Sequence, residues 1–166
     1  KVKFVVNDLL LAISPLKGVF VPINKHGRQS RKASCDVDEA FASDDPVIVF
    51  PAGMCSRRQS DGSICDLEWK KMFVNKAVEH QRDIIPVYFN AQNSSFFYKF
   101  AKFRTRIGLK FNVEMILLPR EMLNKEDARF EMVVGKPIEY QALKNGKYAK
   151  EQAAEIKELV YKLKEQ

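Results

Sequence analysis

Short apolar runs alternate with amphipathic segments along most of this chain. The runs have the length and composition of β-strands, and they are predicted at residues 2–6, 19–23, 47–50, 84–89, 111–118 and 130–134. Several are apolar on both faces, as strands covered by helices on both sides of a sheet must be. The pattern predicts an α/β fold, a mainly parallel mixed sheet flanked by helices, as a single domain over residues 1–166.

Helices are predicted between these strands, at residues 7–14, 36–42, 67–80, 95–107 and 149–164. Asp36 and Glu39 have the spacing of a capping box at the start of the second helix. Asp66 is a suitable N-cap for the third, and Gly108 is a suitable terminator for the fourth. The fifth helix has an apolar stripe formed by Ile156, Leu159, Val160 and Leu163.

The predicted helix at 95–107 combines an aromatic stripe with a basic one. The apolar stripe is Phe96, Phe100, Phe103 and Ile107, and the basic one is Lys99, Lys102 and Arg106. Helices that lie in a membrane interface have this composition, with aromatic residues below the headgroups and lysines facing anionic lipid. A helix that packs its aromatic stripe on the sheet would show the same pattern. The sequence leaves both interpretations open.

The amino-acid composition indicates which partners the protein favours, but it does not identify the kind of protein. The chain has a net charge of +7 and a pI near 9.3, which favours phosphorylated small molecules, nucleic acid or an anionic membrane as partners. Three scattered cysteines give no disulfide framework, and the two histidines lack metal-ligand spacing. We therefore expect a reducing, cytoplasmic environment and no bound metal or cofactor. The longest apolar runs are too short to span a bilayer, and no signal peptide is visible.

Two basic loops follow predicted strands. The first, at residues 24–32, contains Lys25 and His26, and the second, at residues 50–58, ends in Ser56, Arg57 and Arg58. Loops at the carboxyl ends of parallel strands share one edge of the sheet, where α/β proteins bind ligands. Arginine forks fit phosphate bidentately, and a glycine such as Gly53 allows backbone N–H groups to approach an anion. The alternative is a pair of solvated surface loops.

Cys55 lies in the second loop, so a thiol nucleophile is another candidate. Such chemistry needs a base to form the thiolate. Nothing in the sequence brings His26 or His80 close to Cys55, which disfavours this interpretation.

The sequence of the second loop resembles a known family. Phe-Pro-Ala-Gly-Met-Cys-Ser at residues 50–56, followed by Asp-Ile-Ile-Pro-Val-Tyr at 83–88, is similar to the third and fourth motifs of the glycerolipid acyltransferase superfamily, which includes lysophosphatidic acid and glycerol-3-phosphate acyltransferases. Residues 18–24 match its second motif loosely. The closer resemblance, through Pro-Ala-Gly-Met-Cys-Ser-Arg at 51–57, is to a bacterial branch of acyltransferase or hemolysin-like proteins, and motif order agrees over residues 2–137.

The resemblance implies an enzyme that moves a fatty acyl group from acyl-CoA or acyl carrier protein to a hydroxyl or amine of a lipid precursor, such as a lysolipid. It also implies that the substrate-binding residues are Lys25, His26, Gly53, Ser56, Arg57, Arg58 and Pro86. Such an enzyme needs no cofactor beyond its acyl donor. It is expected to be peripheral on the cytoplasmic face of the cell membrane, with no nucleic acid partner.

Several positions depart from the family pattern. Ala52 stands where the third motif has glutamate, and Cys55 stands where it has arginine. The first motif, His-x-x-x-x-Asp, supplies the general base, but Arg31 follows His26 by five residues and Ile85 follows His80 by five. We therefore expect the catalytic pair upstream of Lys1, no catalytic residue in this chain, and no activity of the chain by itself. The alternative function is a non-catalytic basic module that binds nucleic acid or anionic membrane.

Overall fold

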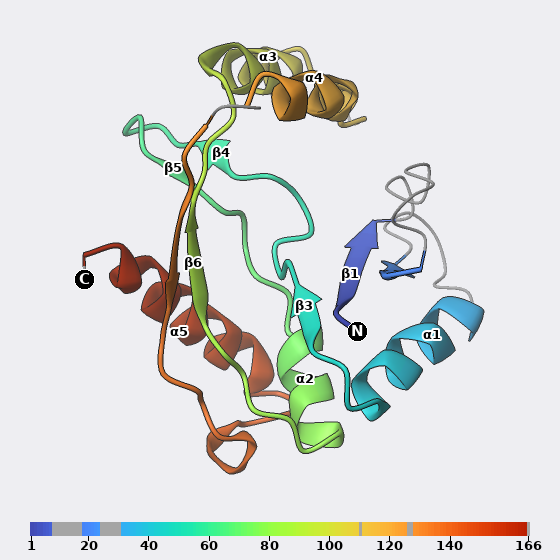
Figure 1. The fold of residues 1–166 in the computed structure, drawn as a ribbon. Helices are drawn as coiled ribbons and strands as arrows, with labels where there is room; N and C mark the ends of the chain where they lie inside the picture. The colour runs from blue at the N-terminus through green and yellow to red at the C-terminus, as the bar shows by residue number, and fades with distance from the viewer. Residues whose placement is uncertain (8–17, 24–30, 110, 126–127, 166) are drawn as a thin grey trace.

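The computed structural model describes residues 1–7, 18–23, 31–109, 111–125 and 128–165 (Figure 1). Two of the predicted binding residues, Lys25 and His26, lie outside the described residues. Residues 8–14 of the first predicted helix also lie outside the described residues.

Three parallel strands form the first sheet, β1 (Lys3–Asn7), β2 (Phe20–Ile23) and β3 (Val47–Val49), in the order β2-β1-β3. Val5 of β1 stands opposite Val21 on one side and Val49 on the other. Helix α1 (Arg31–Ala42) connects β2 to β3 and buries Val37 and Phe41 against these strands. The predicted strands at 2–6, 19–23 and 47–50 are confirmed within a residue or two.

Helix α1 begins five residues earlier than the capping-box pattern predicted. Asp36 and Glu39 therefore lie inside the helix, one turn apart, and the predicted capping box is wrong. The same three-residue spacing places two side chains on one face of a helix, so the sequence pattern could not distinguish the two arrangements.

A second group of elements holds the larger part of the core. Helix α2 (Met72–Glu79) and helix α5 (Ala149–Lys162) pack together beside the antiparallel strands β6 (Val87–Asn90) and β7 (Glu131–Val134). Two short 3-10 helices, η4 (Tyr140–Ala142) and η5 (Leu163–Glu165), flank α5. Ile156, Val160 and Leu163 of the predicted stripe are buried, whereas Leu159 is exposed. The α/β class with parallel and antiparallel strands is confirmed.

Helix α2 begins at Met72, after the position that its predicted cap required. Asp66 does not cap it, because the carboxylate of Asp66 accepts hydrogen bonds from the side chains of Ser56 and Trp69. That part of the prediction is wrong: Asp66 joins two loops instead of beginning a helix.

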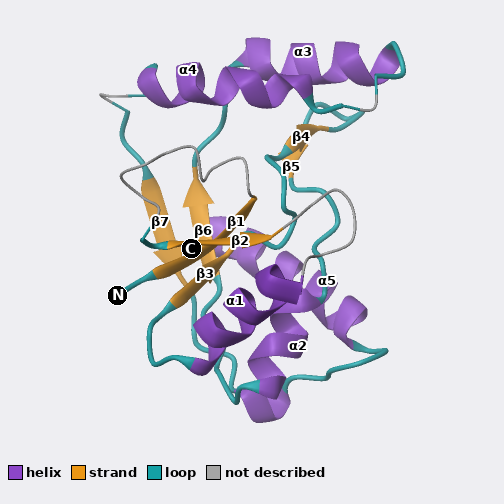
Figure 2. Ribbon diagram, turned by 90° about the vertical axis from the view of Figure 1, so that its right-hand side faces the viewer, coloured by secondary structure: helices purple, strands orange, loops and turns teal. Residues whose placement is uncertain are grey.

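One end of the molecule consists of a separate layer, which we call the outer layer. It contains helix α3 (Ser95–Arg106), the 3-10 helix η3 (Val113–Leu117) and helix α4 (Leu118–Leu123). A short hairpin of β4 (Arg57–Arg58) and β5 (Ile64–Cys65) lies between this layer and the rest of the chain (Figure 2). Helices α1, α2 and α5 gather at the opposite end (Figure 2).

The predicted strand at 111–118 is wrong, since this segment forms η3 and the start of α4. Glu114 and Glu121, seven residues apart, are both buried. A spacing of seven places two side chains on the same face of a helix but on opposite faces of a strand. Pro119 also lies in the first turn of α4, where proline is well tolerated. Helix α3 matches its prediction closely: Ser94 caps it and Gly108, at a φ of +74°, follows its end. Within the described part of the chain, each helix is too short or too polar to cross a bilayer.

Candidate functional site

The candidate site is the loop that leaves β3 and leads into β4 (Figure 1). Strands β2 and β3 both run parallel to β1, so the chain leaves both at the same edge of the sheet. Ligands of α/β proteins often bind at this edge of the sheet. The strands before the two basic loops thus end at one edge, and a joint binding site there stays a prediction. The first of them, residues 24–30, lies outside the described residues.

A tight turn fixes the beginning of the loop. The Gly53 N–H donates to the Phe50 carbonyl at 2.8 Å, with a Gly53 φ of +62°, a conformation that favours glycine. The Pro51 carbonyl accepts a hydrogen bond from the Lys70 N–H at 2.9 Å. Ala52, at the position of the family glutamate, is buried in the core between α2 and α5. The turn therefore holds the backbone in place, and the Gly53 N–H is already occupied.

Ser56 is held by a chain of hydrogen bonds that reaches α5. Its hydroxyl donates to Asp66 Oδ1 at 2.7 Å, and the indole N–H of Trp69 donates to Asp66 Oδ2 at 3.0 Å. The Asp66 N–H in turn donates to the Tyr161 hydroxyl oxygen at 2.8 Å. Burial raises the pKa of Tyr161 to about 12, so its hydroxyl stays neutral at physiological pH. These bonds attach the loop firmly to the core.

Arg57 forms a buried ion cluster with the outer layer. Its Nη2 lies 2.6 Å from Glu114 Oε1, and Nε of Arg104 lies 2.9 Å from Glu114 Oε2. Arg57 Nη1 donates to the Cys55 carbonyl at 2.9 Å, and the guanidinium lies over the ring of Phe97. The Glu114 side chain is 0% exposed. Two cations therefore stabilise one fully buried carboxylate. The guanidinium of Arg57 binds groups of the protein itself, chiefly Glu114 and the Cys55 carbonyl.

Arg58 is in the opposite situation. It follows Arg57 in β4, and neighbouring side chains of a strand point to opposite faces. Arg58 is exposed, and its side chain has no hydrogen-bond or ion-pair partner among the residues that the structure describes. The two arginines of the motif therefore differ: Arg57 connects the loop to the outer layer, and Arg58 presents a free guanidinium to solvent.

Cys55 does not have the properties of a nucleophile. Burial raises the pKa of its thiol above the ordinary value, and this effect outweighs the nearby positive charge of Arg57. A thiol with a raised pKa carries little thiolate near neutral pH.

Pro86 is buried at the beginning of β6. Its carbonyl accepts a hydrogen bond from the Gly135 N–H at 2.8 Å, and its ring lies close to Gly135, as does the side chain of Leu163. Within the described residues, no hydrogen bond joins Pro86 to the loop that carries Arg58. Its predicted place in the wall of the site stays a prediction.

Comparison with known proteins then places the chain. The model of the Acyltransferase family matches residues 1–166. This chain belongs to the Acyltransferase family. The family resemblance inferred from the motifs is thus confirmed, and membership favours an enzyme over a basic module without chemistry.

Two relatives align with nearly all of this acyltransferase-family chain. A lyso-glycine lipid O-acyltransferase of Phocaeicola vulgatus is 46% identical over 162 residues, and one of Bacteroides thetaiotaomicron is 45% identical over 163 residues. Each alignment covers 98% of this chain but only 58% and 60% of the two relatives. The chain therefore spans about three fifths of their length. No solved structure matches it.

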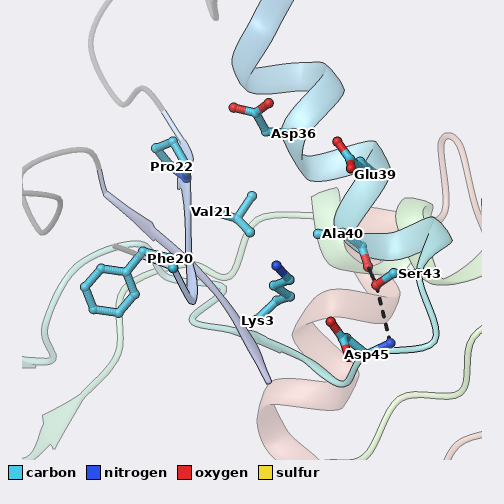
Figure 3. A pocket seen from close by; sticks show the side chains of 10 residues that line it. Lys3, Phe20, Val21, Pro22, Asp36, Glu39, Ala40, Ser43 and Asp45 are labelled. Carbon is cyan, nitrogen blue, oxygen red and sulfur yellow. Dashed lines mark hydrogen bonds between the residues drawn. The ribbon is translucent and has the colours of Figure 1, made fainter. Parts of the chain in front are cut away.

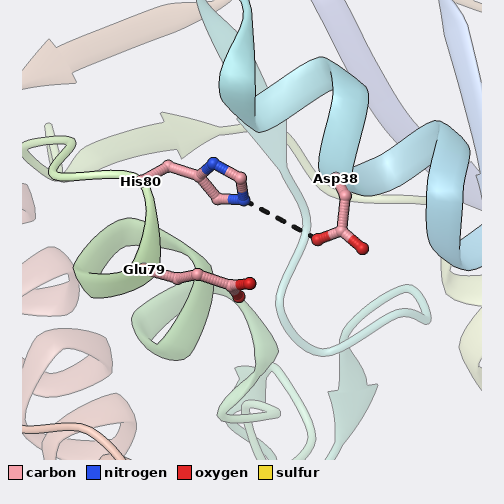
Figure 4. A group of neighbouring side chains, drawn as sticks. All are labelled: Asp38, Glu79 and His80. Carbon is pink, nitrogen blue, oxygen red and sulfur yellow. Dashed lines mark ion pairs between the residues drawn. The ribbon is translucent and has the colours of Figure 1, made fainter.

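Among the described residues of the acyltransferase chain, His80 and Asp38 form a histidine–aspartate pair, but this pair lies away from the candidate loop. His80 Nε2 is 3.7 Å from Asp38 Oδ1 (Figure 4). However, Arg82, two residues after His80, donates a hydrogen bond to the carbonyl of Asp45, which lies just before the start of β3. His80 is therefore near the amino end of β3, whereas the candidate loop leaves its carboxyl end.

The group formed by Asp38, Glu79 and His80 could also hold a metal ion by proximity. In this structure the ammonium group of Lys76 pairs with both Asp38 and Glu79. A cation is thus already supplied by the protein, which argues against a metal at this place.

Two cavities in the acyltransferase chain lie away from the loop. One of about 450 Å³ lies between the edge of the parallel sheet and α1, and its lining includes Asp36, Glu39 and Asp45 (Figure 3). Another, of about 440 Å³, lies beside α5 and includes Trp69 and Tyr161. Three carboxylates against one lysine, Lys3, disfavour an anionic ligand in the first, and Arg58 lines neither.

Sequence reasoning missed Glu114 and Glu121 of the acyltransferase chain. Both are buried acids in a stretch that is otherwise rich in apolar and basic residues. Glu114 forms ion pairs with Arg57 and Arg104. Glu121 accepts hydrogen bonds from the backbone N–H and the hydroxyl of Ser94, at 2.6 Å each. The available signal was that these are the only acids between residues 95 and 125, seven residues apart. A helical interpretation of 111–118 would have placed both on one face.

Proposed function

We propose that the protein carrying this chain transfers a fatty acyl group to the hydroxyl of a lysolipid. The observation that carries the proposal is the similarity over 98% of the chain to two lyso-glycine lipid O-acyltransferases, at 45–46% identity. The described loop, with its free arginine at the carboxyl edge of a parallel sheet, supports it. The family resemblance allows a hydroxyl or an amine acceptor, and the O-acyltransferase relatives favour the hydroxyl.

The acceptor in this proposal is a lysolipid with an anionic headgroup, such as a glycine joined through its nitrogen. Such a headgroup presents a carboxylate, and a guanidinium binds a carboxylate through two parallel hydrogen bonds. Arg58 would make this contact, with Lys25 and His26 contributing from the other basic loop. Arg57 would act as a positioning residue, because Glu114 fixes its guanidinium.

The chemical step needs a base that the family resemblance places upstream of Lys1. A histidine oriented by aspartate would remove the proton from the acceptor hydroxyl, and the oxygen would attack the thioester carbonyl directly. The C–S bond breaks, the thiolate of coenzyme A or of the carrier's prosthetic group leaves, and it takes up a proton. The raised pKa of Cys55 agrees with transfer that forms no acyl-enzyme. In this proposal, residues 1–166 alone bind substrate but do not turn over.

The substrates determine where the protein works. A lysolipid acceptor and its product both reside in a membrane, while acyl-CoA and acyl carrier protein are cytoplasmic. We therefore place the protein on the cytoplasmic face of the cell membrane as a peripheral protein.

The test is an assay of the full-length protein that carries this chain. Purified protein is mixed with palmitoyl-CoA and lyso-glycine lipid, and the release of free coenzyme A thiol is followed together with the diacylated product. Release that requires the acceptor is the expected result. If neither palmitoyl-CoA nor palmitoyl-carrier protein reacts with any lysolipid offered, the proposal is wrong.

A further inference from the structure

Helix α3 turns its aromatic stripe away from the protein. Phe97 and Ala101 are buried, whereas three members of the predicted stripe, Phe96, Phe103 and Ile107, are each more than half exposed. The fourth member, Phe100, is partly buried. The interpretation in which the aromatic stripe packs on the sheet is therefore wrong. A helix with its rings in solvent needs a further reason for their exposure.

The apolar surface continues onto η3 and α4. Ile116 is 80% exposed, Met122 is 64% exposed and Leu123 is 70% exposed. In both ribbon views, no other described element covers the far side of the outer layer (Figures 1 and 2). Large apolar side chains gathered on one exposed layer are typical of an interaction surface.

All exposed charges of this layer have the same sign. Among the described residues between 95 and 125, the exposed charged side chains are Lys99, Lys102, Arg106 and Arg120. The two acids are buried: Glu114 forms ion pairs with Arg57 and Arg104, and Glu121 accepts hydrogen bonds from Ser94. Among the described residues 95–109 and 111–125, the exposed surface is therefore apolar and cationic, and no exposed carboxylate there repels an anionic partner.

We infer that the exposed face of the outer layer docks on an anionic lipid surface. Phe96, Phe103 and Ile116 enter the headgroup region, while Lys99 and Lys102 meet the lipid phosphates. Aliphatic side chains such as Ile116, Met122 and Leu123 favour lipid over nucleic acid, because they offer no ring on which a base can stack. Exposed rings, aliphatic side chains and cations in one layer are the composition that an interfacial surface requires.

The docked face is connected directly to the candidate site. Glu114 of η3 holds Arg57, and Arg58 is the next residue of the same strand. Docking the outer layer would therefore fix the height of Arg58 relative to the lipid headgroups. This part of the inference rests on the proposed function, whereas the docking itself does not.

The experiment is flotation of the full-length protein with vesicles. Equal parts of phosphatidylglycerol and phosphatidylcholine should bind the protein, and phosphatidylcholine alone should bind it much more weakly. Each cation near an anionic leaflet contributes about a fivefold factor to partitioning, so Lys99→Gln with Lys102→Gln should lower it about 25-fold. Phe103→Ser with Ile116→Ser should lower it further, at low and at high salt.

Matched controls come from α5 and η5, which are not part of the outer layer. Lys162 and Lys164 are exposed cations, and Leu159 is an exposed apolar residue of α5. Lys162→Gln with Lys164→Gln, and Leu159→Ser, should leave flotation within about twofold of the unmodified protein, since exposed substitutions away from an interface change little.

The outcomes separate docking from catalysis. Turnover of a short-chain, water-soluble lysolipid should persist in the outer-layer variants while turnover on vesicles falls. If no acceptor reacts but flotation depends on Lys99 and Phe103, the proposed function fails and the docking surface stands. The docking inference is overturned if the outer-layer variants float like the unmodified protein. It is also overturned if these substitutions change only the oligomeric mass, or only the binding of single-stranded DNA.

Discussion

Helices α3 and α5 both carry a stripe of apolar side chains, but α5 buries all of its stripe except Leu159, whereas α3 exposes most of its stripe. On α5, Ile156 and Val160 pack against α2. On α3, the rings of Phe96 and Phe103 face solvent, and the layer to which they belong is attached through buried polar groups around Glu114 and Glu121. The difference shows that an apolar stripe does not by itself identify the face that enters the core.

The buried carboxylate should be the most sensitive point of the outer layer. Glu114→Ala leaves the guanidiniums of Arg57 and Arg104 without their partner, and breaking a buried ion pair in this way costs about 3–5 kcal/mol. Urea denaturation of the full-length protein should show this loss. An unfolding free energy within about 0.5 kcal/mol of the unmodified protein would mean that ionic contacts do not hold this layer.

The two apolar stripes should respond very differently to truncation. Ile156→Ala removes buried methyl groups from the core and should cost about 2–5 kcal/mol. Phe103→Ala removes a ring that is 58% exposed and should change the unfolding free energy by less than about 0.5 kcal/mol. Equal losses in parallel urea titrations would contradict the exposure of the α3 stripe.

The cap of α3 should have an intermediate effect. Ser94 accepts a hydrogen bond from the Phe97 N–H at 3.2 Å, and its own groups donate to Glu121. Ser94→Ala removes the cap and should destabilise the helix by about 1 kcal/mol, whereas Ser95→Ala, one residue later, should have little effect. Thermal unfolding of the two variants provides the comparison, and the order of their melting temperatures decides it.

A partly exposed ion pair between α1 and α2, Lys76 with Asp38, should matter least. The hydrogen bond from Lys76 lowers the pKa of Asp38, although partial burial opposes this change. A lowered folded-state pKa contributes stability above the unfolded value, near pH 4, and this contribution is lost as the pH falls through the lower folded value. Because Asp38 is 43% exposed and solvent screens the pair, Asp38→Asn should cost only about 0.5 kcal/mol at pH 7. The difference between the two proteins should shrink below pH 4 in acid titrations of stability, and a difference that grows there would contradict this assignment.

The sequence predicted the elements whose burial follows directly from periodicity. The strands around Val5 and Val49, the helix with Ile156 and Val160, and the glycine end of α3 all agree with the structure within a few residues. The loop at 50–56 also pointed correctly to the family. In each case a local pattern was sufficient, because the same residues determine both the local conformation and the packing.

The missed features depend on partners that are distant in sequence. Glu114 is buried because Arg57, 57 residues earlier, pairs with it, and no local pattern reveals that pairing. For the same reason the sequence could not separate Arg57 from Arg58, since only the pairing engages one and leaves the other free. Asp36 and Asp66 were assigned to helix caps because the same residue types also serve inside helices and between loops.

The central claim is that Arg57 and Arg58 have separate roles. The most direct test compares Arg58→Ala with Arg57→Ala in the full-length protein. The acceptor KM and the unfolding free energy are measured for both variants. Arg58→Ala should raise the KM for lyso-glycine lipid at least about tenfold, the effect of losing a charged hydrogen bond, without changing stability. Arg57→Ala should lower the unfolding free energy by about 3 kcal/mol, because it leaves a buried carboxylate with one cation. An unchanged acceptor KM in Arg58→Ala, or a stability loss in Arg58→Ala equal to that in Arg57→Ala, would contradict the account.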